Sequence, residues 1–294
     1  MISCIITGYK EPTTIGKAIE SIRWSCIKAR VDYEILVIAP DLETLNEAHR
    51  YSGKYIRVIQ DPGRGKPCAL NIAFKEAKGH LLVLTDGDVF VNQYAIAELI
   101  KKAAERPNIG AVSGHPRSIE SKNNMYGFWS HLLTDMADKT RKNANGNFVV
   151  SGYLYALRPG IVNEIPEDCL SDDAYISFKI LEKGYKIDYS FGAQAFVKYP
   201  DNFSDWMKQK KRSTGGFTQL TSEYKMKPIK EMRSFTQEVK GLFSVLKYGK
   251  SFKEFWWIKL LIAARIWLWM NIFYERRILK KDFNKTWVRI ESTK

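Results

Sequence analysis

Up to residue 116, short apolar runs alternate with longer segments that mix apolar and polar positions. We predict strands for the short runs, at residues 4–9, 33–40, 55–61, 80–89 and 109–116. We predict helices for the mixed segments, at residues 11–22, 41–51, 68–79 and 92–107. The run 33–40 is almost continuously apolar, which is typical of a strand covered on both faces. This order predicts an α/β fold, Rossmann-like, whose mostly parallel sheet carries helices on both faces.

The pattern is less regular between residues 117 and 217. We predict helices at residues 123–142, 171–184 and 202–217. We predict strands at residues 147–158 and 188–200. The last of these helices is expected to end at Gly215 and Gly216, because glycine commonly closes a helix.

Beyond residue 225 the sequence is basic and aromatic. Apolar residues recur at helical spacing between Ile229 and Leu246, which predicts a basic amphipathic helix. The segment 255–274 is about as long as a membrane span, but Lys259 and Arg265 interrupt it, at a cost of about 2.5–3.5 kcal/mol for each centrally placed charge. We expect it to lie in the membrane interface; a true or re-entrant span and a packed soluble helix are the alternatives.

The formal net charge of +14 is concentrated in the same region. Residues 225–294 hold 17 Lys+Arg and 6 Asp+Glu, a net of +11, which leaves 29 against 26, or +3, for residues 1–224. Five of the eight tryptophans also lie there. Nucleic acid is a competing partner, but Trp, Leu and Ile among the cations favour an anionic membrane surface and no nucleic acid. We therefore divide the chain into an α/β domain (1–222) and C-terminal amphipathic, membrane-associated helices (223–294).

The cysteines and the N-terminus bear on the compartment. The four cysteines show no CxxC spacing, which favours buried thiols in a reducing environment. The opening MISCIITGY has the pattern of a strand and lacks the features of a secretory signal. Together with the basic C-terminal region, this predicts a peripheral or monotopic protein on the cytoplasmic face of the cell membrane.

Candidate chemistry gathers where the predicted strands end. Ligands bind beyond the carboxyl ends of parallel strands, and Tyr9, Asp41, the loop 61–67 and the pair Asp86 and Asp88 all lie at such ends. Two aspartates separated by one glycine after a buried strand are costly unless something compensates them. A hard divalent cation completed by substrate phosphates suits this role, with Asp88 facing the metal and Asp86 reaching the metal or a sugar hydroxyl. A solvated turn is the alternative.

Several motifs in residues 2–217 together resemble the family 2 glycosyltransferases of GT-A fold. ISCIITGYKE resembles the family's opening strand, which implies that Tyr9 and Glu11 meet the base and ribose of a nucleotide. EILVIAPD resembles the second strand, which puts Asp41 near the base. GRGKPCALNIAFKEAKG resembles a stretch that brings Lys66 near the nucleotide, and TDGDV resembles the family's DxD, which holds Mn²⁺ or Mg²⁺ on the diphosphate of a sugar donor.

The resemblance continues on the acceptor side. CLSDDAYISFKILEKGYKI resembles a family stretch in which Asp173 is the catalytic base and Asp172 replaces the preceding Glu; capping of a helix is the alternative for both. SGYLYALR resembles the acceptor-floor strand, with Gly152 at its small-residue position.

QKKRS resembles a QxxRW motif and brings Gln209 and Arg212 toward the acceptor or diphosphate. Ser213 in place of the Trp counts against processive synthesis. Many members carry a metal-binding His after the last strand, where FVKYP offers Lys198 and no His.

The sequence thus predicts an inverting, metal-dependent enzyme that moves one sugar from a nucleotide-sugar donor, preferably UDP-linked, to a lipid-linked or membrane-located acceptor. A hydroxyl acceptor needs a base such as Asp173, whereas a phosphate acceptor is already anionic near neutral pH. The alternatives are a GDP-mannose-type polyprenyl-phosphate glycosyltransferase, a sugar nucleotidyltransferase and a catalytically silent membrane-recruited scaffold. A nucleotidyltransferase needs a glycine-rich phosphate loop after the first strand, and TGYKEPTT does not supply one.

Overall fold

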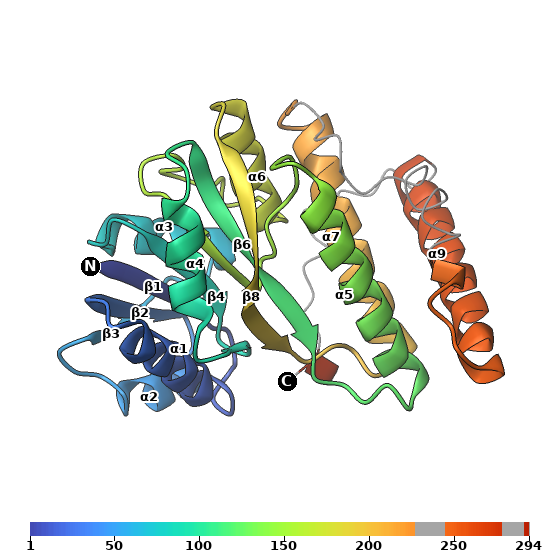
Figure 1. Cartoon of the computed structure of the whole chain (residues 1–294), viewed down its shortest axis with the longest axis horizontal. Coiled ribbons are helices and arrows are strands. Elements are labelled where there is room, and N and C mark those ends of the chain that lie inside the picture. Colours follow the sequence, from blue (N-terminus) through green and yellow to red (C-terminus); the bar gives the residue numbers. More distant parts are fainter. Residues whose placement is uncertain (227–244, 278–290, 294) are drawn as a thin grey trace.

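The computed structural model of this protein describes residues 1–226, 245–277 and 291–293. Within them, eight strands form one sheet in the order β3-β2-β1-β4-β7-β6-β8-β5 (Figure 1). The strands are β1 Ile2–Thr7, β2 Tyr33–Ala39, β3 Ile56–Gln60, β4 Leu82–Asp86, β5 Phe90–Val91, β6 Ile109–Ser118, β7 Leu154–Leu157 and β8 Lys186–Val197. The helices are α1 Ile15–Ala29, α2 Leu42–His49, α3 Lys66–Glu76, α4 Ala95–Ala104, α5 Met125–Asn143, α6 Asp172–Glu182, α7 Phe203–Ser222 and α9 Phe252–Arg277, with a short 3₁₀ helix η2 at Glu291–Thr293.

The two halves of the sheet differ in strand direction. Strands β3, β2, β1 and β4 are all parallel to their neighbours in this half. Strand β7 is antiparallel to both β4 and β6, β5 is antiparallel to β8, and β6 with β8 is parallel. The predicted α/β fold is therefore confirmed as a mixed sheet, parallel in its first half.

Helices cover both faces of the sheet, and the alternation of side chains along β1 explains how. Ile2, Cys4 and Ile6 point into a buried cluster with α1 and α4, whereas Ile5 points into a second cluster with α3 and α6. Because each face buries its own apolar layer, a substrate can be met at the carboxyl edge of the parallel strands, where ligands bind in such sheets.

Two sequence predictions are corrected by the structure. The strand predicted at 147–158 is reduced to Leu154–Leu157, because side-chain hydroxyls bind the preceding backbone: Ser177 Oγ accepts from Val150 N at 3.0 Å and Ser113 Oγ from Ser151 N at 2.9 Å. Helix α7 does not end at Gly215 and Gly216 but continues to Ser222. A Cβ on Gly216 would lie 2.6 Å from Ser171 Cβ, so this glycine permits close packing of α7 on the loop before α6.

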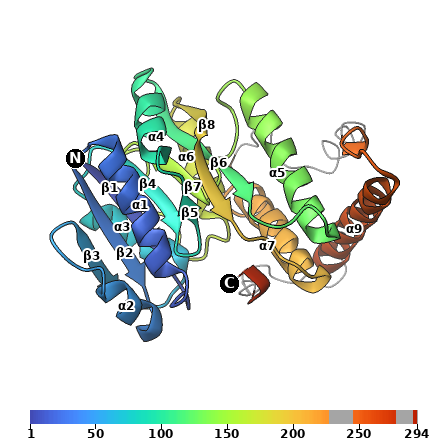
Figure 2. The same cartoon turned by 60° about the horizontal axis from the view of Figure 1, so that its bottom comes forward.

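Helices α5, α7 and α9 lie on the side of the molecule away from β1, β2 and β3 in both views (Figures 1 and 2). An apolar cluster joins the three helices through Phe128, Trp129 and Leu132 of α5, Trp206 of α7 and Ile258, Leu261 and Ala264 of α9. Trp129 Nε1 donates to Trp257 O at 2.8 Å, and Lys211 of α7 forms an ion pair with Glu275 of α9. Most of the amphipathic helix predicted between Ile229 and Leu246 lies outside the described residues.

Candidate active site

The turn after β4 presses the two aspartates of the TDGDV motif against the end of β1. Gly87 N donates to Thr7 O at 2.8 Å, and a Cβ on Gly87 would lie 2.9 Å from Ile15 Cδ1. The contact explains why glycine separates Asp86 from Asp88. Both aspartates line a cleft of about 1320 Å³ that runs along the carboxyl edge of the sheet.

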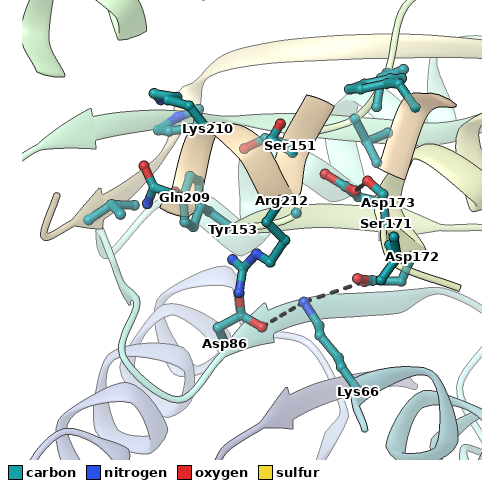
Figure 3. A pocket seen from close by; sticks show the side chains of 18 of the residues that line it. Lys66, Asp86, Ser151, Tyr153, Ser171, Asp172, Asp173, Gln209, Lys210 and Arg212 are labelled. Carbon is teal, nitrogen blue, oxygen red and sulfur yellow. Dashed lines mark hydrogen bonds and ion pairs between the residues drawn. The ribbon is translucent and has the colours of Figure 1, made fainter. Parts of the chain in front are cut away.

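Lys66 lies between the aspartates that follow β4 and the carboxylates at the start of α6. It begins α3, and its Nζ lies 2.7 Å from Asp86 Oδ1 and 3.4 Å from Asp172 Oδ2 (Figure 3). Burial alone would lower the pKa of Lys66, but Asp172 and Asp86 outweigh it and raise the pKa well above its usual value. Lys66 is therefore a fixed cation between two carboxylates that come from distant parts of the chain.

Asp172 is a carboxylate of the cleft with one buried oxygen outside any hydrogen bond from the described residues. Its Oδ2 is buried and accepts no hydrogen bond from the described residues, so the Lys66 ammonium at 3.4 Å is its electrostatic support. Burial raises the pKa of Asp172; Lys66 opposes this rise, and Asp173 and Asp86 add to it. Such a group is suited to bind a polar atom of a substrate.

The two carboxylate oxygens of Asp173 differ: Oδ1 accepts hydrogen bonds from the protein, and Oδ2 lies beside Gly152. Ser171 Oγ donates to Asp173 Oδ1 at 2.7 Å, and Ala174 N donates to the same oxygen at 2.8 Å. The other oxygen, Oδ2, lies 3.1 Å from the position that a Cβ on Gly152 would take. Gly152 thus leaves space beside Oδ2, and the hydrogen bonds direct that oxygen toward the cleft.

The residues predicted to meet the nucleotide have different surroundings. Exposed Tyr9 and buried Glu11 both line the cleft, and Glu11 Oε2 accepts from Thr14 Oγ1 at 2.9 Å. Asp41 stands outside the lining and caps α2, accepting from Thr44 N at 3.0 Å and Lys10 N at 2.7 Å. Burial alone would raise the pKa of Asp41, but these hydrogen bonds lower it. Its contact with a base stays a prediction.

Helix α7 contributes Gln209 and Arg212 to the cleft. Figure 3 shows Arg212 extending toward Asp86, and the Oε1 atom of Gln209 is buried without a hydrogen-bond partner in the described chain. Tyr153 lies nearby, and burial raises its pKa to about 12, with the Asp88 carboxylate adding to the effect. Arg212 and Lys66 both lie where they can meet a diphosphate.

The donor set fits a divalent cation held jointly by protein and substrate. Residues 1–226, 245–277 and 291–293 contain no cluster of three His, Cys, Asp or Glu that could hold a metal by itself. Mg²⁺ and related hard cations are commonly bound by one or two carboxylates plus substrate phosphates. Asp86 and Asp88 supply such a pair. Lys198, which lies near the position where many members of the resembled family carry a metal-binding His, also lines the cleft.

Sequence reasoning named the loop 61–67 but missed two residues around the site. Asp61, which directly follows β3, is buried and lines the cleft, as expected for this loop. Ser171 orients Asp173, and only the hydrogen-bonding geometry reveals it. Tyr155 lies under the floor, and its buried hydroxyl has no hydrogen-bond partner in the described part of the chain.

Comparison with known proteins identifies the class of this site. Residues 3–164, just over half of the chain, match the model of the glycosyl transferase family 2. The chain belongs to this family. As a family 2 glycosyltransferase it is an enzyme, and the matched residues include β1 to β7 but end before Asp172, Asp173 and α7.

Curated relatives of this family 2 glycosyltransferase include poly-β-1,6-N-acetyl-D-glucosamine synthases. The protein from Staphylococcus aureus is 24% identical over 236 residues, and that from Staphylococcus epidermidis is 22% identical over 236 residues. Each match covers 76% of this chain and 56% of the relative. The chain therefore spans a little over half the length of these relatives.

Solved structures of similar fold extend the comparison beyond residue 164 to most of the chain. A mannosyltransferase, PcManGT from Pyrobaculum calidifontis in complex with GDP-Man and Mn²⁺, has a TM-score of 0.63 at 17% identity, covering 96% of this chain and 88% of its own. Glucosyl-3-phosphoglycerate synthase from Mycobacterium tuberculosis, in complex with Mn²⁺ and UDP, has a TM-score of 0.50 at 16% identity, covering 78% and 81%. These likenesses establish the GT-A fold of the chain.

Proposed function

We propose that this glycosyltransferase moves a single sugar, with inversion, from a nucleotide-sugar donor to an acceptor at a membrane surface, using Mn²⁺ or Mg²⁺. The proposal rests above all on one observation. Asp86 and Asp88 after β4, Lys66 at the start of α3, and Asp172 with Asp173 at the start of α6 all line one cleft. A donor-side metal pair and an acceptor-side carboxylate therefore face each other across a space that can hold both substrates.

Asp173 Oδ2 is the proposed base. It accepts the proton of the acceptor hydroxyl while the acceptor oxygen forms a bond to the anomeric carbon of the sugar. The bond from that carbon to the diphosphate oxygen breaks, and the nucleoside diphosphate leaves with the electron pair. Because Ser171 Oγ and Ala174 N already occupy Oδ1, the proton goes to the oxygen that faces the cleft.

Charge on the leaving diphosphate needs compensation from fixed positive groups. Lys66 and Arg212 extend toward the cleft beside Asp86, where a diphosphate attached to a nucleotide held by Tyr9 and Glu11 would lie. A divalent cation held by Asp88 and Asp86 would supply further positive charge to the diphosphate oxygens. Asp172 and Gln209, with buried oxygens that lack partners among the described residues, are proposed to bind the acceptor.

The donor is proposed to be UDP-linked, with GDP-linked sugars as the alternative. The neighbour from Mycobacterium tuberculosis was solved with UDP, and the mannosyltransferase from Pyrobaculum calidifontis with GDP-Man. The relatives' names point to N-acetylglucosamine, yet Ser213 in place of the Trp of processive synthases supports transfer of one sugar here.

A membrane-located acceptor, lipid-linked and on the cytoplasmic face, is the second part of the proposal. Residues 225–294 carry a net charge of +11 and five tryptophans. Among the described residues, one helix, Phe252–Glu275, is long and apolar enough by length and composition to cross a membrane. We propose residues 1–222 as the catalytic domain and 223–294 as the region that brings it to an anionic membrane surface.

Calorimetry of nucleotide binding tests the donor half of this proposal. We expect UDP to bind only with Mn²⁺, and binding to disappear in Asp88→Asn but not in Glu20→Gln, a matched change on the exposed face of α1. Metal-dependent binding of GDP instead of UDP would move the proposal to the alternative donor. Folded protein that binds neither nucleotide would overturn it in favour of the silent scaffold.

A further inference from the structure

Helix α9 is apolar on two opposite faces, and the described residues of the protein cover one of them. Ile258, Leu261, Ala264, Leu268 and Ile272 are buried against α5 and α7 and the loop before α6. The opposite face is exposed although it consists mainly of large apolar residues: Phe252, Phe255, Trp256, Ile266, Trp267, Met270, Phe273 and Tyr274. We call this set the α9 outer face. A contiguous apolar face of this kind on a soluble surface indicates a site of association.

The neighbours of α9 determine how it can meet a bilayer. Its contacts with α5 and α7 run from Trp257 near its start to Glu275 near its end. Helix α5 carries Asp135, Asp138, Lys139, Arg141 and Lys142, and α7 carries Lys208, Lys210, Lys211 and Arg212. If α9 crossed the bilayer, these charges would be carried into the hydrocarbon with it, which is strongly unfavourable. Helix α9 therefore suits a position in the plane of one leaflet.

The composition of the outer face fits an anionic lipid surface. Tryptophan and tyrosine favour the headgroup level of a bilayer, and Lys259 lies exposed between Trp256 and Ile266 along the helix. Lys253 lies over the ring of Trp257 at 4.6 Å, at the start of the same helix. Lysines beside an apolar face complement anionic headgroups, and this combination favours a lipid surface over a protein partner or a second copy of the chain.

The active-site cleft extends to this face. Its lining includes Leu261, Ile262, Arg265, Ile266 and Trp269 of α9, together with apolar residues of α5 such as Leu133 and Met136. Ile266 belongs to both sets, because it lines the cleft and is 51% exposed on the outer face. The cleft that contains Asp173 thus reaches the surface that α9 presents to lipid.

We propose that α9 lies in one leaflet of an anionic membrane and that the cleft opens sideways into it between α5 and α9. The acceptor is then an amphiphile whose chain stays among the lipids and between these helices while its hydroxyl reaches Asp173; the acceptor part of this inference rests on the proposed function. Basic side chains along the route, Lys139, Arg141, Lys210 and Arg265, suit an anionic link between chain and sugar.

Vesicle flotation of the full chain tests the surface. Wild type is expected to float with vesicles of phosphatidylcholine and phosphatidylglycerol, and Trp267→Glu/Phe273→Glu to lose binding by at least about tenfold. The matched control, Trp24→Glu/Leu42→Glu, adds the same charge on α1 and α2, where the two side chains are 51% and 67% exposed, against 54% and 63% for Trp267 and Phe273. Equal flotation of both variants would overturn the assignment to lipid. A wild-type dimer that is lost in Trp267→Glu/Phe273→Glu would do the same, because the outer face would then bind a second copy of the chain.

Depth measurements distinguish a helix in the plane from a span. Lys259→Cys and Met270→Cys, each carrying a fluorophore, place probes about 16 Å apart along the axis of α9, and the four native thiols are buried. Quenching by shallow and deep brominated lipids should give the two probes the same depth. A difference in depth comparable to their separation would show that α9 crosses the membrane and would contradict the proposal.

Photocrosslinking tests the sideways opening. A photoreactive residue at Ile262 is expected to crosslink to a sugar linked through phosphate to a polyprenyl chain and embedded in the vesicles, and one at Leu42 is not. Crosslinks at Ile266 without any at Ile262 would contradict the opening while leaving the membrane face intact. Nucleotide binding by the same preparation separates the two proposals. Crosslinking without nucleotide binding would support the sideways opening and overturn the donor assignment. Nucleotide binding without crosslinking would support the donor assignment and overturn the opening.

Discussion

The parallel half of the sheet and helix α9 are both rich in apolar residues, but they bury them differently. Strands β1, β2 and β4 enclose their apolar side chains between helices on both faces, and the polar groups of the cleft lie at the carboxyl edge. Helix α9 buries one apolar face against α5 and α7 and leaves the other exposed. The first region is enclosed by its own helices, whereas the described residues leave the outer face of the second uncovered.

Substitution of the proposed base is expected to give the largest effect and to leave both regions folded. Asp173→Asn should lower turnover by about 10³-fold, because an amide cannot accept the acceptor's proton, while UDP affinity changes little. Release of UDP from donor and lipid extract, measured beside calorimetry, checks both values. Asp201→Asn, on an exposed carboxylate before α7, is the control. Turnover close to wild type in Asp173→Asn would remove Asp173 from the mechanism.

Paired truncations on α9 test the comparison directly. Leu268 is fully buried, and Leu268→Ala should lower the free energy of unfolding by about 2–4 kcal/mol through lost burial and a residual cavity. Met270, two residues further along the same helix, is exposed, and Met270→Ala should stay within about 0.5 kcal/mol in water. Urea unfolding without lipid measures both. Equal losses would mean that the outer face is also covered by protein.

Most of the fold could be predicted because local pattern and burial agree in the parallel half. Alternating runs located strands β1 to β4 and the helices between them, and the ends of those strands located Asp86 and Asp88. The short strand β7 and the full length of α7 could not be predicted in this way. Before β7, side-chain hydroxyls of distant residues accept the backbone hydrogen bonds that a neighbouring strand would otherwise accept. In α7, Gly216 allows close contact with Ser171 and does not end the helix.

The same limit applies to the site. Strand ends and the resemblance to the family pointed to Lys66, Asp173 and Arg212, all of which line the cleft. They did not reveal that Asp41 caps α2, nor that Lys66 bridges Asp86 and Asp172. Asp41 accepts from Thr44 N only three residues further on, so the N-cap preference for Asp could have predicted this role. The contact of Lys66 with Asp172 joins segments more than a hundred residues apart, which no local pattern records.

Ser171 allows a smaller and more specific test of the acceptor side. Ser171→Ala removes the hydrogen bond to Asp173 Oδ1 and should lower kcat by about tenfold, with little change in the KM for the donor. Ser171→Thr keeps the hydroxyl and should restore most of the rate if the added methyl group is accommodated beside Gly216. The pH profile of kcat should shift in the Ala variant only. An unchanged profile would make Ser171 a packing residue.

The junction between the two regions contains a buried histidine whose titration should give the smallest effect. His115 of β6 lies 2.6 Å from the Tyr189 hydroxyl of β8, which donates at 2.6 Å to Asp138 of α5. Burial lowers the pKa of His115; Asp138 opposes this, and Arg117, Arg141 and Lys142 reinforce it. The network therefore holds α5 on the sheet with a neutral imidazole.

The sign of the pH effect follows from that lowered pKa. Above the unfolded value of about 6.5 the stabilisation is fully present, and it is lost as the pH falls through the lower pKa of the folded state, because the unfolded chain binds the proton first. Between about pH 7.5 and about pH 5.5, wild type should therefore lose about 1 kcal/mol more than His115→Gln, which cannot titrate there. Urea unfolding of both proteins at the two pH values measures the difference. Parallel losses would show that α5 is held to the sheet by packing alone, and that the junction resembles the buried face of α9 more than the polar edge of the sheet.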